Sequence, residues 1–195
     1  MATAHYEAET PKRTFVGTIK PRIESNLGFR VPGKVAKRLV EIGQTVDVGQ
    51  PLAVLDKVDL RLQAEQAQAE LSASTGVLAQ AAAAEKRAKE LRAKGWNTDA
   101  QLDSAKAAAD EAQARFDRAQ RSVELTSNAL SYATLKADAR GVIPATLVEP
   151  GQVVAAGQAA IRLARFGEKE AWVAIPETLV ERAKTGTATV TLWSD

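Results

Sequence analysis

The chain has 195 residues, of which 45% are hydrophobic and 26% charged, and this balance excludes both a disordered and a collagen-like chain. Its net charge of +2 comes from 26 basic and 24 acidic residues interspersed along the sequence. That distribution offers no concentrated basic surface, so we expect no nucleic-acid partner. The sequence has no run of about eighteen apolar residues, so no segment is predicted to span a bilayer.

Few residues are suited to catalysis or metal binding. The absence of cysteine excludes disulfides, thiolate metal sites and cysteine nucleophiles. The one histidine, His5, falls in a predicted N-terminal tail, and neither a glycine-rich phosphate loop nor a pair of carboxylates stands out. We therefore expect no enzyme activity, metal or cofactor. The first residues lack the apolar core of a signal peptide, which indicates a cytoplasmic protein or one whose targeting segment has been removed.

The first predicted elements are β-strands. Residues 1–20 are expected to form a tail followed by a strand over residues 14–20. Residues 21–57 then contain a motif, GKVAKRLVEIGQTVDVGQPLAVLD at 33–56, that returns without a gap 108 positions later as GVIPATLVEPGQVVAAGQAAIRLA at 141–164. The matching pairs are Gly33/Gly141, Leu39/Leu147, Val40/Val148, Glu41/Glu149, Gly43/Gly151, Gln44/Gln152, Val46/Val154, Gly49/Gly157, Gln50/Gln158 and Leu55/Leu163. One copy has too few strands to bury a face, so the two copies are expected to pack together as one β-sandwich.

Each copy of the repeat carries two glycines six residues apart, Gly43 with Gly49 and Gly151 with Gly157. Glycine adopts positive φ without a steric penalty. These four residues are therefore predicted to form tight turns between short strands.

The segment between the copies, residues 58–135, has the periodicity of helices. Two helices of nearly equal length, 58–94 and 99–135, are predicted to form an antiparallel hairpin about 55 Å long. Apolar and small residues recur at alternating spacings of three and four along each helix, which is the pattern of a coiled-coil seam. The first seam is Leu60, Ala64, Ala67, Leu71, Ser74, Leu78, Ala81, Glu85 and Ala88. The second seam is Leu102, Ala105, Ala109, Ala112, Phe116, Ala119, Val123, Thr126, Leu130 and Ala133.

The predicted tip of the hairpin is residues 95–98, Gly-Trp-Asn-Thr. Gly95 suits the position just after a helix C-terminus. Thr98 suits the N-cap of the second helix, and Gln101 would complete a capping box three residues later.

After the hairpin, residues 136–165 form the second β-motif and residues 166–195 the end of the chain. Strands are expected over residues 171–195, with a short helix that starts at Pro176-Glu177-Thr178 and ends at Gly186.

Three segments of the sequence closely resemble the periplasmic adaptor subunits, or membrane fusion proteins, of the HlyD/RND type found in tripartite multidrug efflux pumps. They are GFRVPGKV at 28–35, VEIGQTV at 40–46 and GQPLAVLD at 49–56, and residues 135–163 resemble the second lipoyl half of the same family. The resemblance implies an α+β fold: a split lipoyl-like β-sandwich, or barrel-sandwich hybrid, with a coiled-coil hairpin between its halves and part of a β-barrel. The barrel needs more strands than the chain supplies, so we expect a truncated protein or fragment, with a naturally short protein as the alternative.

The resemblance also implies partners and contact residues. Family members bridge an inner-membrane transporter and an outer-membrane channel in the periplasm, and they assemble side by side, commonly as hexamers. Their hairpin tips carry an Arg, a Leu four residues later and a Ser seven beyond that, which contact the channel. Arg87, Leu91 and Thr98 stand at this spacing, and Trp96 is placed beside them. The alternative is structural: Thr98 only caps its helix, Leu91 ends the seam and Arg87 is solvated.

Two other functions remain as alternatives. One is an adaptor of an ABC-type or type I secretion system, against which the tip residues argue mildly. The other is a lipoyl or biotinyl carrier, since Leu55-Asp56-Lys57-Val58 superficially resembles a carrier motif with Lys57 as the acceptor. A carrier lysine lies in a tight, exposed β-turn, whereas Lys57 is predicted to open a long helix.

Overall fold

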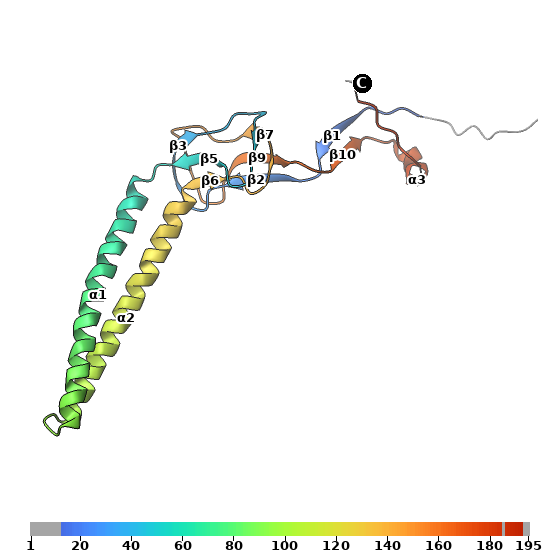
Figure 1. The fold of residues 1–195 in the computed structure, drawn as a ribbon. Coiled ribbons are helices and arrows are strands. Elements are labelled where there is room, and N and C mark those ends of the chain that lie inside the picture. Colours follow the sequence, from blue (N-terminus) through green and yellow to red (C-terminus); the bar gives the residue numbers. More distant parts are fainter. Residues whose placement is uncertain (1–12, 185, 193–195) are drawn as a thin grey trace, which may run out of the picture.

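The computed structural model describes residues 13–184 and 186–192, which form an elongated molecule with three parts (Figure 1). A β-sandwich lies in the middle, a long helical hairpin projects from it, and a two-stranded ribbon extends away from the opposite side. His5, the one histidine, lies outside the described residues.

The sandwich consists of two four-stranded sheets. The first has the order β2 (Glu24–Gly28), β9 (Ala159–Arg165), β7 (Gly141–Thr146) and β4 (Thr45–Val46). The second has the order β6 (Thr134–Lys136), β5 (Pro51–Leu55), β3 (Gly33–Arg38) and β8 (Val153–Val154). All pairings within the two sheets are antiparallel.

The two copies of the repeat exchange strands. Strand β4 of the first copy pairs with β7 of the second, and β8 of the second pairs with β3 of the first. The backbone hydrogen bonds repeat the same symmetry: Gly43 N–H donates to the Ile143 carbonyl and Gly151 N–H to the Val35 carbonyl, both at 2.8 Å. Neither copy can complete a sheet alone, so the predicted single sandwich is confirmed as one folding unit.

The turn glycines of the repeat all have positive φ, with values of 85°, 80°, 93° and 79° at Gly43, Gly49, Gly151 and Gly157. A glutamine follows each of them, and its side-chain oxygen accepts a hydrogen bond from the backbone N–H three residues earlier. The Gly-Gln dipeptide therefore supplies both the backbone conformation and a side-chain clamp for each turn.

The core of the sandwich draws on both copies. Its largest fully buried side chains are Phe29, Leu52, Leu55, Ile143, Ile161 and Leu163. Burial of a side chain of this size is worth about 1.5–3 kcal/mol each. The packed core makes the sandwich a rigid base for the hairpin.

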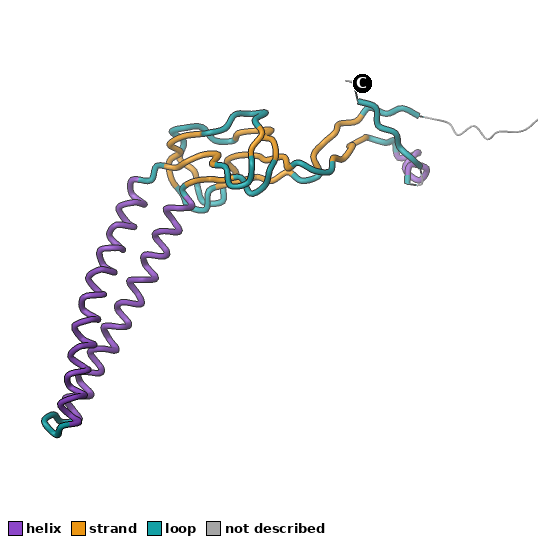
Figure 2. The backbone as a smooth tube through the Cα atoms, viewed as in Figure 1, coloured by secondary structure: helices purple, strands orange, loops and turns teal. Residues whose placement is uncertain are grey.

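The hairpin consists of α1 (Val58–Ala93) and α2 (Asp99–Tyr132), which run antiparallel (Figure 2). Every residue of the two predicted seams is buried or half-buried, so the seams are confirmed. Ser74 is a polar seam residue that is only 6% exposed, and its hydroxyl donates to the Leu71 carbonyl at 2.9 Å. The polar atom is thus satisfied within its own helix.

The second helix ends three residues earlier than the sequence predicts. Residues 134–136 form strand β6, which pairs with β5, and Leu135 is buried in the sandwich. The helical pattern misleads here because Ala133 is buried both as a seam residue and as part of the sandwich core.

The ribbon pairs β1 (Gly17–Pro21) with β10 (Lys169–Val173) and is followed by the short helices η1 (Glu177–Leu179) and α3 (Val180–Ala183). Of the strands expected within residues 171–195, β10 covers the first, whereas the strand expected after the short helix is wrong for residues 186–192, which form none; residues 193–195 lie outside the described residues. A strand needs a neighbour to complete its backbone hydrogen bonds, and residues 186–192 pair with no strand of the described chain. The part of the chain that the structure describes thus contains two strands of a barrel.

Candidate partner-binding site at the hairpin tip

The tip begins where α1 ends in a Schellman motif. Gly95 has φ of 77°, its N–H donates to the Arg92 carbonyl at 3.0 Å, and the Trp96 N–H donates to the Leu91 carbonyl at 2.9 Å. These two bonds satisfy carbonyls that the helix end would otherwise leave unpaired. They also set the backbone direction at which Trp96 leaves the helix.

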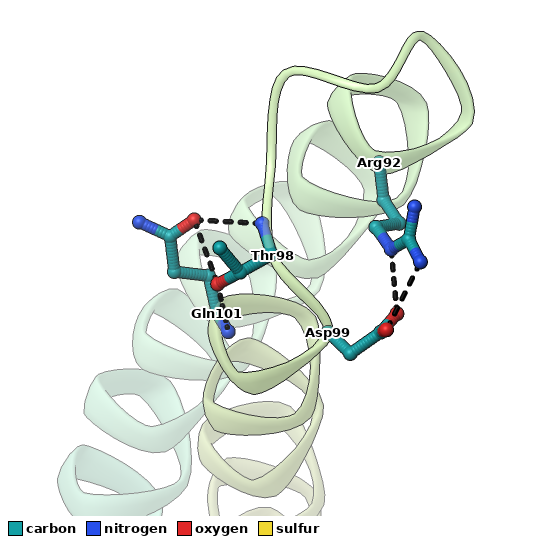
Figure 3. A network of polar contacts seen from close by, with 4 residues as sticks. All are labelled: Arg92, Thr98, Asp99 and Gln101. Carbon is teal, nitrogen blue, oxygen red and sulfur yellow. Dashed lines mark hydrogen bonds and ion pairs between the residues drawn. The ribbon is translucent and has the colours of Figure 1, made fainter.

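The start of α2 carries the predicted capping box, which is confirmed (Figure 3). The Thr98 hydroxyl accepts the Gln101 N–H at 3.3 Å, and the Gln101 side-chain oxygen accepts the Thr98 N–H at 2.9 Å. Two of the unpaired donors at the helix N-terminus are thereby satisfied.

An ion pair that sequence reasoning missed closes the tip from the other side. Arg92 contacts Asp99 through two bonds, Nε to Oδ1 at 2.5 Å and Nη2 to Oδ2 at 3.0 Å (Figure 3). The hydrogen bond and positive charge of Arg92 lower the pKa of Asp99, and the same carboxylate raises the pKa of Arg92. The seam spacing could have revealed this residue, because Arg92 lies four positions after Ala88, where the next seam residue falls.

The four residues that the sequence singled out occupy different environments. Trp96 is 78% exposed and Leu91 is 39% exposed. Arg87 is exposed one turn before Leu91 on the same face of α1, and it makes no hydrogen bond or ion pair within the described part of the chain. Thr98 lies across the loop, where it caps α2. Because Arg92 takes the seam position, Leu91 lies off the seam and is partly exposed to solvent.

The base of the hairpin is tied to the sandwich by two side-chain contacts. The Lys57 Nζ donates to the Thr134 hydroxyl at 2.6 Å, and the Arg30 guanidinium lies 3.8 Å from the centroid of the Tyr132 ring. Lys57 is half-buried and immediately precedes α1, as the sequence predicts. This is not the exposed β-turn that a carrier lysine requires.

The family model described as "RND MFP, barrel-sandwich hybrid domain" matches residues 24–164, well over half of the chain. The chain therefore belongs to the family of RND membrane fusion proteins, which are periplasmic adaptors. No curated protein matches the sequence. None of the helices within residues 13–184 and 186–192 has the length and apolar character needed to span a membrane.

Several solved structures share the fold. A candidate efflux transporter of Bacteroides eggerthii is 26% identical, with a TM-score of 0.56, and the alignment covers 87% of this chain and 48% of that one. A MacA–MexA chimera with the α-hairpin domain of Pseudomonas aeruginosa MexA is 26% identical, with a TM-score of 0.60 and coverage of 85% and 54%. The periplasmic adaptor protein EmrA is 17% identical, with a TM-score of 0.52 and coverage of 86% and 79%. The chain spans about half the length of the first two structures.

Proposed function

We propose that this chain acts as a non-catalytic periplasmic adaptor that bridges an inner-membrane RND transporter and an outer-membrane channel in a drug-efflux pump. The observation that carries the proposal is an exposed tryptophan at the end of a long helical arm. Tryptophan is enriched among the residues that supply most of the binding energy of protein–protein interfaces, so an exposed tryptophan at a turn favours contact with a partner.

The helical arm, α1 with α2, is suited to holding two partners at a fixed distance rather than to catalysing a reaction. At 1.5 Å per residue, the 36 residues of α1 extend about 54 Å. The seam holds both helices together along this length, and the contacts of Lys57 and Arg30 fix the arm to a packed sandwich. A partner that binds the tip is thereby held at a set distance from whatever binds the sandwich or the ribbon.

The tip offers three kinds of contact to an outer-membrane channel. Trp96 and Leu91 supply apolar surface, and Arg87 supplies a forked donor for carboxylates or carbonyls at the helical ends of a channel. Thr98 keeps the hydroxyl of the serine in the family pattern, although its role in this chain is also to cap α2. The half-exposed position of Leu91 off the seam favours contact over the purely structural reading.

We further propose that copies of the chain associate side by side, as a hexamer in the assembled pump. Leu62, Val77 and Leu125 are exposed on the arm, outside the seam between α1 and α2. Apolar side chains in these positions favour packing between neighbouring arms.

Adaptor function in an ABC-type or type I secretion system is the second candidate. The family model is that of RND adaptors, and the tip residues fit the efflux pattern, so both favour the first candidate. A lipoyl or biotinyl carrier is the least favoured function, because Lys57 is engaged with Thr134. Intact mass after co-expression with a lipoyl or biotinyl ligase tests it: the proposal expects no added group.

Binding to outer-membrane efflux channels tests the proposed function. The full chain is titrated against a panel of purified channels in lipid nanodiscs, together with Arg87→Asp, Leu91→Ala and the control Arg118→Asp. Arg118 is an exposed arginine in the middle of α2, so its reversal changes the charge equally without touching the tip. We expect one or more channels to bind the chain and the control, and the tip variants to lose binding with unchanged melting temperatures. Binding to no channel, or equal binding by all variants, would contradict the proposal.

A further inference from the structure

At the tip, the coiled-coil seam ends in a charged pair instead of an apolar layer. The seam of α1 continues in steps of three and four through Glu85 and Ala88, and the next step reaches Arg92. On α2 the first seam residue is Leu102, and the seam position four residues before it is Thr98, the N-cap. Asp99 follows Thr98 directly. The two-bond ion pair between Arg92 and Asp99, called the fork below, therefore joins the last turn of α1 to the first turn of α2.

Helix dipoles favour this arrangement of charges. Arg92 lies in the last turn of α1 and Asp99 in the first turn of α2. A cation at a helix C-terminus and an anion at a helix N-terminus are each stabilising. Each residue is therefore favourable at its own helix end, independently of the ion pair between them. The guanidinium fork then fixes the relative direction of the two ends, which a single point charge such as lysine would not do.

The loop itself has little else to hold it. Trp96 is 78% exposed, so packing of its ring contributes little to its position. The Schellman bonds belong to α1 and the capping box belongs to α2, and neither joins one helix to the other. The fork is the side-chain contact that spans the loop (Figure 3).

We propose that Arg92 and Asp99 are positioning residues that hold residues 95–98 in one conformation and thereby present Trp96 and Leu91 to the channel as a single surface. This inference rests on the proposed function of the tip. Both side chains are substantially exposed, at 42% for Arg92 and 76% for Asp99, so their ion pair adds little to the stability of the whole chain. Its effect is instead to keep the loop ordered.

The order of Trp96 is measured first, without any channel. Trp172→Phe and Trp193→Phe leave Trp96 as the only tryptophan of the full chain. Indole ¹⁵N relaxation and fluorescence anisotropy then report its mobility in this background and in Asp99→Asn, Arg92→Lys and Asp99→Glu. A matched control, Glu111→Gln, breaks the exposed pair of Glu111 with Arg115, which lies within α2 at 2.6 Å.

We expect Asp99→Asn and Arg92→Lys to make Trp96 more mobile, Asp99→Glu to restore much of its order, and Glu111→Gln to have no effect. Melting temperatures of all variants should stay close to that of the background protein. Equal mobility of Trp96 in the background protein and in Asp99→Asn would overturn the proposal, whatever happens to channel binding.

Affinity for a channel that binds the unmodified chain is measured second, with the same variants. When only a fraction of molecules is competent to bind, the apparent Kd rises by the inverse of that fraction. A fall of the ordered fraction to about one fifth thus predicts an apparent Kd about fivefold higher. A more mobile Trp96 with unchanged affinity for the channel would overturn the proposal that Arg92 and Asp99 present Trp96 and Leu91 to the channel. Failure of the unmodified chain to bind any channel would instead contradict the proposed function.

Discussion

Three glycine-to-alanine substitutions should change stability in three different ways, because the glycines differ in backbone conformation and in the space around an added methyl group. At Gly43 the backbone has φ of 85° and an added Cβ would have open space around it. The cost is therefore that of a left-handed conformation alone, about 1–2 kcal/mol. At Gly141 the added Cβ would lie 2.2 Å from the Ala164 carbonyl oxygen, where strands β7 and β9 pair. Backbone atoms cannot move aside cheaply, so about 3 kcal/mol is expected.

Gly76 provides the control with the opposite sign. It lies on the exposed side of α1, and an added Cβ would meet nothing within 4 Å. Alanine is a better helix former than glycine by about 1 kcal/mol, so Gly76→Ala should stabilise the hairpin.

The assay follows the sandwich and the hairpin separately. Hydrogen exchange of amides in β5 and β9 reports on the sandwich, and helical circular dichroism during thermal melts reports on the hairpin. Gly43→Ala should lower the free energy of opening measured by exchange of the sandwich amides by about 1–2 kcal/mol. Gly76→Ala should raise the Tm of the hairpin by about 2–4 °C, because 1 kcal/mol shifts Tm by about that much in a chain of this size. A neutral Gly43→Ala, a milder effect at Gly141 than at Gly43, or a destabilising Gly76→Ala would contradict these expectations.

Three further outcomes are expected. Replacing residues 60–130 by a short glycine-rich loop should leave a cooperatively folded β-protein, because both copies of the repeat remain; a non-cooperative melt would show that the arm is needed for the core. Thr98→Ala should cost about 1 kcal/mol of helix stability in thermal melts while Thr98→Ser is nearly silent, and equal effects would remove the capping role. The pKa of Asp99 is lower in the folded state than in the unfolded state, because Arg92 stabilises its carboxylate. The stabilising contribution of Asp99 is therefore present at neutral pH and is lost below about pH 4. A carboxyl NMR titration that shows an ordinary pKa for Asp99 would contradict its ion pair with Arg92.

Much of the fold was predictable because its signals are local or repeated. The seams follow from spacing along one helix, and the capping box of Thr98 and Gln101 follows from two residues three apart. The repeat predicts that two distant segments form one sandwich. It does not predict that β4 and β8 cross to the other copy, because strand exchange leaves the apolar pattern of each copy unchanged.

The sequence predicts the wrong secondary structure where one residue belongs to both the helical seam and the sandwich core, and where a predicted strand has no neighbouring strand. Ala133 ends the helical seam and enters the sandwich core, so the sequence pattern extends the helix too far. Residues 187–192 have strand-like composition but no neighbouring strand within the described chain. At the tip, Arg92 was missed because a charged residue in a seam position resembles a solvated one until its partner across the loop is seen.

In the proposed function, the tip of the arm, rather than its sides, contacts the outer-membrane channel. Site-specific photo-crosslinking tests it directly, with a benzophenone amino acid placed at Lys94, which immediately precedes the tip loop, or at Gln80 on the exposed side of α1. The chain is irradiated with a purified channel that binds it. We expect channel crosslinks from position 94 that vanish with Arg87→Asp, and only crosslinks between copies of the chain from position 80. Channel crosslinks of equal yield from both positions, or from position 80 alone, would contradict it.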